Sequence, residues 1–457
     1  MRRCVSQTQQ KSNIFMTTQT LILDRPKQFQ LSRSNAVFRV FLIILGFVIL
    51  LLIALTKAHT FGDFWTDPLA LLYTLFVTTF ELSRLAGAVF YKYTYSKILP
   101  EKNNVEYEPS ISFVIPCKNE EKTIAKTIAK CFGSEYPPDK VEVIVINDGS
   151  TDNTIGVLES LKHVYKNLIV VDWKKNRGKR YGMAEGFRKS KGEIIVQLDS
   201  DSYVEPATLP HLIRLFKNPK IGAVCAHADP ENADENLLTK MQTAYYFLSF
   251  RILKAAESTF LTVFCCSGCS SAYRKDIVMP ILDMWLNERF LGLPVTWGDD
   301  RGLTNWVLKL GYHTIYTDEV QAYTIVPNNL KQFLKQQVRW KKGWFVNSIF
   351  ASRFIYKREP FVAFTYFFPL IFVTLLTPFM AAKAFFYNTI FMHNPPFFYI
   401  LGIFLVACII TVYYRHVAPE NKYWPYIFVW SAINVIFLSF ILFYALITIQ
   451  NRKWGTR

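Results

Sequence analysis

The chain has 457 residues, of which 51% are hydrophobic and 39 are phenylalanine, more apolar than an ordinary soluble domain. The formal net charge of +17 would suit a nucleic-acid partner, but the cations cluster beside apolar runs and form no basic face with interleaved aromatic residues. We therefore expect a protein that contacts membrane lipids and has no nucleic-acid partner.

The eight cysteines, spread from Cys4 to Cys408, show no spacing typical of a small disulfide-bonded domain. Cys265, Cys266 and Cys269 form a cluster, but no second pair of ligands for zinc accompanies it. We expect reduced, cytosolic thiols.

The N-terminal part predicts a cytosolic tail and a membrane hairpin. Residues 1–36 are polar and basic, too long and too polar before the first apolar run for a cleaved signal peptide. Residues 37–92 contain two apolar runs long enough for two transmembrane helices. Glu81 and Arg84 in the second run lie at i and i+3, so they can neutralise each other. Cations flank both ends of this hairpin, which places the following domain in the cytosol.

Residues 108–330 change to short β-rich runs separated by charged, helical stretches. This alternation is typical of a parallel sheet with crossover helices, and ligands of such sheets lie at the carboxyl ends of the strands. Asp148 and Asp199 both fall at such ends. The predicted strands are 110–116, 141–147, 167–172 and 192–198.

The C-terminal part returns to the membrane. Residues 331–358 are basic and amphipathic, as helices lying on a membrane surface are, and 361–414 contain two further transmembrane runs. The last run, 423–449, carries Pro425 and internal polar residues, so we expect an interface or re-entrant helix. A fifth crossing would also put the cations of the tail 450–457, "QNRKWGTR", outside the cell.

Two strand ends carry acidic side chains that fit phosphate chemistry. "INDGSTDNT" puts Asp148 in a loop between a strand and a helix, although an ordinary capping turn uses the same residues. "QLDSDS" ends a buried strand in Asp199 and Asp201, one residue apart. Two such carboxylates suit Mg²⁺ or Mn²⁺ holding a diphosphate.

Two further stretches carry charge at predicted helix starts. "NRGKRYG" places Lys179 and Arg180 behind a glycine, where a phosphate can approach, but a solvated basic turn has the same composition. "TWGDDRGLTN" offers Asp299 and Asp300, and a like-charged neighbour raises the pKa of a carboxylate, which suits a general base. Helix capping by one aspartate, with the other paired to Arg301, is the alternative.

"KQQVRW" places Gln336, Arg339 and Trp340 at i, i+3 and i+4 of one helix. This group can hydrogen-bond a phosphate and stack on a sugar ring, and it also fits an amphipathic membrane face.

These stretches, in this order and approximate spacing, resemble the processive family-two glycosyltransferases, among them cellulose, chitin and hyaluronan synthases. Within that group the chain is most similar to the hyaluronan synthases over most of its length. The stretches that carry the likeness are "GKR" (178–180), "CCSGCSSAYR" (265–274), "GDDRGLTN" (298–305), "FLKQQVRW" (333–340) and "WGTR" (454–457).

The resemblance implies an α/β GT-A domain, a Rossmann-like mixed sheet, inserted between transmembrane helices, and an inverting transfer that uses Mg²⁺ or Mn²⁺. It implies Asp300 as the general base beside Asp299, Asp201 as the metal ligand, and Cys266, Ser267 and Trp340 as acceptor contacts. The implied nucleotide contacts are Asp148, Lys179, Arg180, Asp199, Gln336, Arg339, Trp340, Trp454 and Arg457.

The implied function is polymerisation of UDP-GlcNAc and UDP-GlcA into hyaluronan, with UDP-sugars and the growing polysaccharide as partners. The expected location is the plasma membrane, crossed several times by a chain that needs no partner subunit. Cys269 stands where hyaluronan synthases usually have Pro, and Lys341–Gly343 where they tend to have Asn-Lys-Ser. A chitin-like synthase using UDP-GlcNAc alone, a non-processive lipid-linked transferase and a nucleotide-regulated channel are the alternatives.

Overall fold

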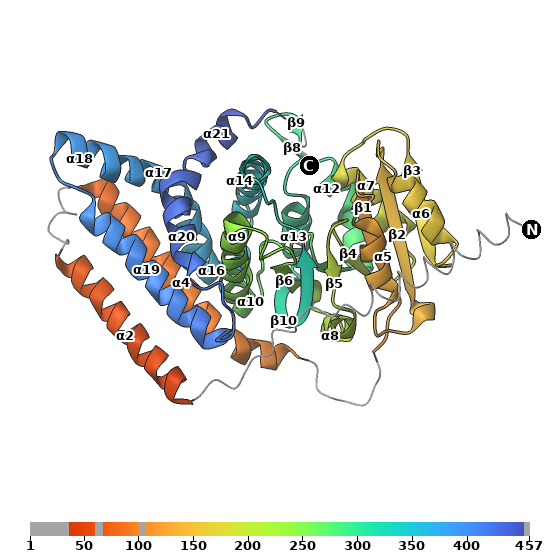
Figure 1. Ribbon diagram of the computed structural model, residues 1–457, viewed down its shortest axis with the longest axis horizontal. Helices are drawn as coiled ribbons and strands as arrows, with labels where there is room; N and C mark the ends of the chain where they lie inside the picture. The colour runs from red at the N-terminus through yellow and green to blue at the C-terminus, as the bar shows by residue number, and fades with distance from the viewer. Residues whose placement is uncertain (1–35, 60–66, 100–106, 452–457) are drawn as a thin grey trace, which may run out of the picture. The chain divides into compact units, whose positions relative to one another are not determined.

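The computed structural model describes residues 36–59, 67–99 and 107–451, and the chain divides into two compact units. The first unit contains the β-sheet and the second consists of helices (Figure 1). Their described parts fall in Thr94–Glu231 and Leu261–Ile325 for the first unit, and in Phe29–Tyr93, Asn232–Phe260 and Val326–Arg457 for the second.

The first unit alternates strands and helices through most of its length. Its elements are β1 (Ile111–Cys117), α5 (Ile124–Phe132), η1 (Pro138–Lys140), β2 (Val141–Asp148), α6 (Thr154–Lys162), β3 (Leu168–Trp173), α7 (Lys179–Lys189), β4 (Ile194–Gln197), β5 (Tyr203–Val204), η2 (Pro206–Thr208), α8 (Leu209–Leu215), β6 (Ile221–Pro230), β7 (Ser271–Arg274), α11 (Lys275–Val278), η4 (Met279–Ile281), α12 (Leu282–Leu286), β8 (Arg289–Phe290), β9 (Leu293–Pro294), α13 (Asp299–Lys309) and β10 (His313–Thr324).

The main sheet has eight strands in the order β3-β2-β1-β4-β7-β6-β10-β5. The four predicted strands correspond to β1–β4, and β1 pairs in parallel with β2 and β4, as β2 does with β3. β7 is antiparallel to both β4 and β6, which makes the sheet mixed. The expected GT-A-like α/β fold is therefore confirmed.

The inner strands β1, β2, β4 and β6 are buried on both faces, which explains their continuous apolar runs. Every residue of β1 and of β6 is buried. α5, α6 and α7 contact β1–β3, whereas α8 and α13 contact β6 and β10 (Figure 1). Because β1, β2 and β4 are parallel, their carboxyl ends meet at one edge, where the loops after Asp148 and Gln197 begin.

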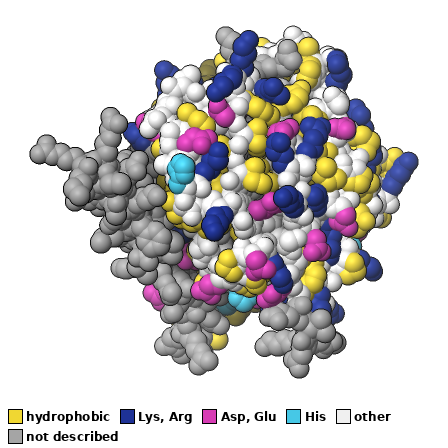
Figure 2. Space-filling model, turned by 90° about the vertical axis from the view of Figure 1, so that its right-hand side faces the viewer, with side chains coloured by type: hydrophobic (Ala, Val, Ile, Leu, Met, Phe, Trp, Pro, Cys, Tyr) yellow, Lys and Arg dark blue, Asp and Glu magenta, His cyan; other side chains and the backbone are white. Residues whose placement is uncertain are grey.

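The surface of the first unit on the side of β3 and α6 mixes both signs of charge. Lys and Arg side chains alternate there with Asp and Glu, with hydrophobic side chains between them (Figure 2). In this unit Lys162 pairs with Glu159 at 3.1 Å and Lys174 with Asp172 at 2.6 Å, so part of the charge is locally compensated. This composition is ordinary for a surface in contact with water.

The second unit is built from long apolar helices and short interrupted ones. Its elements are α2 (Ala36–His59), α4 (Pro68–Ile98), α9 (Leu237–Phe247), η3 (Leu248–Lys254), α10 (Ala255–Thr259), α14 (Leu330–Ser352), α15 (Ile355–Arg358), α16 (Pro360–Val362), η5 (Ala363–Phe367), α17 (Phe368–Ala382), η6 (Lys383–Tyr387), α18 (Asn388–Phe391), α19 (Phe397–Val417), α20 (Tyr426–Ile433), η7 (Asn434–Leu438) and α21 (Ile441–Ile447).

Among the described residues, four helices are long and apolar enough to cross a membrane. The last apolar region, Tyr426–Ile447, is bent by 43° at a short break, and it would make a fifth span only if both parts cross together. The bend agrees with the expected interface or re-entrant helix, which stays a prediction. The other candidates are Val40–Lys57, Pro68–Ile98, Pro360–Phe391 and Phe397–Val417.

α4 is held against the continuous stretch of η5, α17 and η6 by contacts along its length. Glu81 and Arg84 form the ion pair on α4 that their spacing predicts. The contacts with the later helices are the Asp67–Lys383 ion pair, a Tyr73–Thr377 hydrogen bond of 3.1 Å, stacked Phe76 and Phe372 rings, and a Ser83–Thr365 hydrogen bond of 3.5 Å.

The boundary of the sheet-containing unit differs from the expected continuous range 108–330. Residues 232–260, which form α9, η3 and α10, belong to the second unit. Gln242 on α9 donates to the carbonyl of Pro327 at 2.7 Å, and Lys422 forms an ion pair of 2.7 Å with Asp234. This segment is polar enough to resemble its neighbours in sequence, but its packing partners lie among the later helices.

Candidate active site

Asp148 organises the loop that leads into α7. It is the last residue of β2, is 4% exposed, and accepts hydrogen bonds from the backbone N–H groups of Arg177 at 2.6 Å and Gly178 at 2.9 Å. Gly149 has φ +65°, and a Cβ there would lie 2.7 Å from the Asn176 nitrogen. Both the left-handed backbone and the close approach require glycine at this position. The Asp148 turn and the basic loop therefore form one packed structure.

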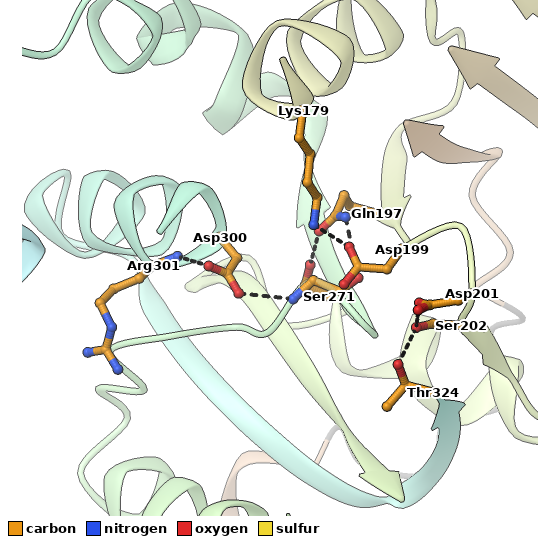
Figure 3. Close-up of polar contacts among 10 residues, drawn as sticks. Lys179, Gln197, Asp199, Asp201, Ser202, Ser271, Asp300, Arg301 and Thr324 are labelled. Atoms are coloured by element: carbon orange, nitrogen blue, oxygen red, sulfur yellow. Dashed lines mark hydrogen bonds and ion pairs between the residues drawn. The ribbon is translucent and has the colours of Figure 1, made fainter. Parts of the chain in front are cut away.

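Lys179, the first residue of α7, points to the end of β4. Its ammonium group forms an ion pair with Asp199, two residues beyond that strand (Figure 3). Burial lowers the pKa of Lys179, but the negative charges of Asp199 and then Asp300 outweigh it and raise the pKa above its ordinary value. Lys179 therefore remains a cation at any physiological pH and can attract a phosphate.

Gly268 joins the two acidic stretches of the site. Its N–H donates to Asp300 Oδ2 at 3.1 Å, and its carbonyl accepts from the Asp199 N–H at 2.9 Å. The same carbonyl accepts from the Gln197 side chain at 3.3 Å (Figure 3). A Cβ on Gly268 would lie 2.9 Å from Asp199 Oδ1 and 3.2 Å from Lys179 Nζ. Only glycine fits between these charged groups without moving them.

The two aspartates of the "GDD" stretch have different surroundings. Gly298 adopts φ +68° and starts α13, so both Asp299 and Asp300 lie in the first turn of that helix. Asp300 is partly exposed, and Oδ1 accepts from the Arg301 N–H at 2.8 Å while Oδ2 accepts from Gly268. Asp299 is only 3% exposed and lies 3.9 Å from the Arg180 guanidinium. Asp300 is thus the carboxylate that a substrate can reach.

Asp201 lies apart from the Lys179–Asp199 pair. The Ser202 hydroxyl contacts Asp201 Oδ1 at 3.1 Å and Thr324 at 2.8 Å (Figure 3). The described chain contains no group of three or more His, Cys, Asp or Glu side chains that could enclose a metal ion. A single carboxylate still fits Mg²⁺ or Mn²⁺, because such ions commonly take their other ligands from water and substrate phosphates.

The loop before β7 holds two of the three predicted acceptor contacts, Cys266 and Ser267. Cys266 is completely buried, and its N–H donates to the Thr304 hydroxyl at 3.0 Å. Ser267 is partly exposed, and its carbonyl accepts from the Ser270 N–H at 3.0 Å. Of the two predicted contacts, the Ser267 side chain is therefore the accessible one. None of the described cysteines forms a disulfide.

Gln336, Arg339 and Trp340 lie on α14, in the second unit, and their contact with a nucleotide stays a prediction. The Trp340 ring lies 6.2 Å from that of Tyr245, which in turn stacks on Trp430 at 4.1 Å. The Gln336 Oε1 is buried and has no protein partner among the residues placed in the structure. A hydroxyl donor would fit there.

Not every predicted site residue joins the cluster. Arg180 points away from Lys179 into a buried acidic pocket. Trp454 and Arg457 lie outside the described residues. The structural roles of Gly268 and Gln197 were missed by sequence reasoning, because a glycine in a loop and a polar residue at a strand end carry no specific signal.

The chain is similar to known glycosyltransferases. The model of the family described as glycosyl transferase family 2 matches residues 112–282. A hyaluronan synthase of Streptococcus pyogenes serotype M6 is 30% identical over 433 residues, which are 92% of this chain and 98% of that protein. An N-acetylglucosaminyltransferase of Azorhizobium caulinodans is 28% identical over 359 residues, 78% of this chain and 89% of that protein.

Among solved structures, a mannosyltransferase from Pyrobaculum calidifontis in complex with GDP-Man and Mn²⁺ covers 84% of this chain with a TM-score of 0.49 and 18% identity. Its ligands say nothing about those of this chain. The streptococcal likeness, by contrast, spans nearly the whole of both sequences. The chain accordingly belongs to the hyaluronan synthase-like family-two glycosyltransferases.

Proposed function

We propose that this glycosyltransferase, whose family builds polysaccharide from UDP-sugars, polymerises UDP-GlcNAc and UDP-GlcA into hyaluronan with inversion at the sugar carbon. The observation that carries the proposal is the cluster in which Gly268 links Asp199, Lys179 and Asp300 at the carboxyl edge of the sheet. In this cluster Lys179 would attract a diphosphate, and Asp300 would accept the proton of a hydroxyl. The 30% identity to a hyaluronan synthase supports the product.

The geometry supports Asp300 as the general base. Two backbone N–H groups, from Gly268 and Arg301, fix the orientation of its carboxylate, and each oxygen keeps a free lone pair. Asp300 would accept the proton of the acceptor hydroxyl while that oxygen attacks C1 of the donor sugar. UDP leaves from the opposite face, so the product has a β-linkage.

The donor would be held at the adjoining strand ends. Asp148 and Asp199 face the nucleotide, and Lys179 supplies positive charge to the diphosphate. Gln336, Arg339 and Trp340 remain candidate contacts of the donor or acceptor. Ser267 would border the acceptor end, and the buried Cys266 would support it from within the loop. Asp299 would support the general base Asp300 from the same first turn of α13.

Asp201 would hold Mg²⁺ or Mn²⁺. The bound ion would neutralise charge that develops on the leaving diphosphate. Asp199, already engaged by Lys179, is less available as a ligand than Asp201. The donor set of hard oxygens agrees with either ion.

The membrane part would export the polymer from the cytosol. The four candidate spans and their cationic flanks support a cytosolic sheet-containing unit at the plasma membrane. Trp454 and Arg457 of the tail would close over the nucleotide during turnover. A channel fed by its own active site explains why one chain contains both an α/β unit and a bundle of apolar helices.

A chitin-like synthase that uses UDP-GlcNAc alone is the second candidate, favoured by the likeness to an N-acetylglucosaminyltransferase and by Cys269 in the acceptor loop. The test incubates the purified protein with each UDP-sugar singly and with both together, and sizes the product. Hyaluronan requires both donors and yields a polymer that hyaluronidase degrades. A long, chitinase-sensitive polymer from UDP-GlcNAc alone would select the second candidate.

A further inference from the structure

Arg180 follows Lys179 directly but faces the opposite side of the α7 start. Its side chain is only 5% exposed. The guanidinium forms an ion pair with Glu288, donates to the Val295 carbonyl at 2.8 Å, and lies 3.9 Å from Asp299 Oδ1. Its flat face covers the Trp285 ring at 4.5 Å. One buried cation therefore touches several segments that precede Asp300.

We propose that Arg180 is a positioning residue that sets the place of Asp300 relative to the Lys179–Asp199 pair, and that it does not bind the nucleotide. The inference rests on the proposed function only for the role of Asp300 as base. It assigns Arg180 a task different from the nucleotide contact that its place beside Lys179 suggests.

The contacts explain how the guanidinium transmits position. Glu288 and Val295 flank the β8–β9 hairpin and close its base, where the Val295 N–H donates to the Glu288 carbonyl at 2.9 Å. Glu288 also accepts a hydrogen bond from the Trp306 ring nitrogen on α13. Arg180 thus fixes the segment that enters α13 from both sides of the hairpin, and α13 begins with Asp299 and Asp300.

Arginine is the side chain suited to this task. Its planar fork carries several donors, so it can serve a carboxylate and a carbonyl at once while stacking on an indole. The neighbouring residues Lys179 and Arg180 therefore contact different acidic side chains. Lys179 contacts Asp199 and is near Asp300, whereas Arg180 contacts Glu288 and Asp299.

The burial argues against a direct contact with the donor. A phosphate would have to displace Glu288 and approach Asp299, two carboxylates that repel it. Conversely, removing the Arg180 charge leaves both acids buried without their cation, which is strongly unfavourable. The expected effect of substitution is a displaced base rather than a weakened nucleotide site.

The experiment compares Arg180→Met with Arg188→Met, the same change on the same helix at an exposed ion pair with Asp283. For Arg180→Met, we expect kcat to fall by about 10- to 100-fold, as a base shifted by up to about 1 Å implies, while KM for both donors and the affinity for UDP stay within about threefold. Arg188→Met should leave kcat and KM unchanged.

A second variant tests the proposal even if Arg180→Met destabilises the fold. Glu288→Gln keeps the shape of the partner, and in the double variant with Arg180→Met it removes a charge that methionine leaves unpaired. The melting temperature of the double variant should therefore be no lower than that of Arg180→Met alone. Additive losses would overturn the proposal.

The remaining outcomes are also decisive. A KM or UDP dissociation constant raised tenfold or more with unchanged kcat would make Arg180 a nucleotide contact. Loss of activity that follows the melting temperature across the variants would mean that Arg180 contributes only packing. If the wild type releases no UDP from any sugar nucleotide, the proposed function fails, whereas UDP affinity and the melting-temperature cycle still decide the role of Arg180.

Discussion

A single methyl group on Gly268 should disable the site while leaving the fold intact. In Gly268→Ala the new Cβ would lie 2.9 Å from Asp199 Oδ1 and 3.2 Å from Lys179 Nζ. Ordinary contact needs about 0.5 Å more, and both atoms are the ends of flexible side chains that can move. The melting temperature should therefore change by no more than about 3 °C.

The displaced groups, however, are the ones proposed to hold the donor diphosphate. Since a 1 Å error in a reacting geometry costs about 100-fold, a shift of half that size should lower kcat by at least about tenfold. UDP release measured at saturating donor gives this number. Gly402→Ala is the matched control, because a Cβ there meets nothing within 4 Å. A Gly268→Ala enzyme with more than about half of the wild-type kcat would refute the steric reasoning.

Asp300→Asn should lower polymer synthesis by about 10²–10⁴-fold with UDP binding intact; more than about a tenth of wild-type synthesis would contradict its role as base. Asp201→Ala should reproduce the effect of EDTA, and full turnover in EDTA would remove the metal from the scheme. Burial lowers the pKa of Lys341 to about 8, so stability should rise between pH 8 and 10.5, where only the unfolded chain holds the proton. Lys341→Met should flatten that rise in thermal melts. A cysteine at Thr456 should react with impermeant maleimide only from the cytosol, and deleting 454–457 should abolish turnover; outside labelling or a fully active truncation would contradict the closing role of the tail.

The sheet could be predicted where strands are long and apolar. β1–β4 follow runs of Val and Ile that only a buried parallel sheet accommodates. β7, the antiparallel strand Ser271–Arg274, could not be predicted. The strand has only 4 residues, these form no apolar run, and their pairing partners lie far away in the sequence. That residues 232–260 belong to the helical unit could not be predicted either, because tertiary contacts decide it.

The sequence predicted which residue types form the site, but not which way each side chain points. Lys179 and Arg180 are adjacent cations, and Asp299 and Asp300 are adjacent acids, yet one of each pair faces the site and the other is buried. Neighbours on a helix point about 100° apart, and nothing in a short stretch says which of them meets the solvent. The direction of Arg180 depends on the β8–β9 hairpin, because Arg180 contacts Glu288 and Val295 at the base of that hairpin.

The pairing of α4 with the stretch of η5, α17 and η6 also has a consequence for how the protein is made. Asp67 precedes its partner Lys383 by 316 residues, and Tyr73 precedes Thr377 by 304. A ribosome that adds about 5–20 residues per second needs about 15–60 s to cover that distance. Throughout that interval α4 has been synthesised while the helices that hold it have not. The start of α4, with Asp67 and Tyr73, therefore stays without these partners until Lys383 has been synthesised.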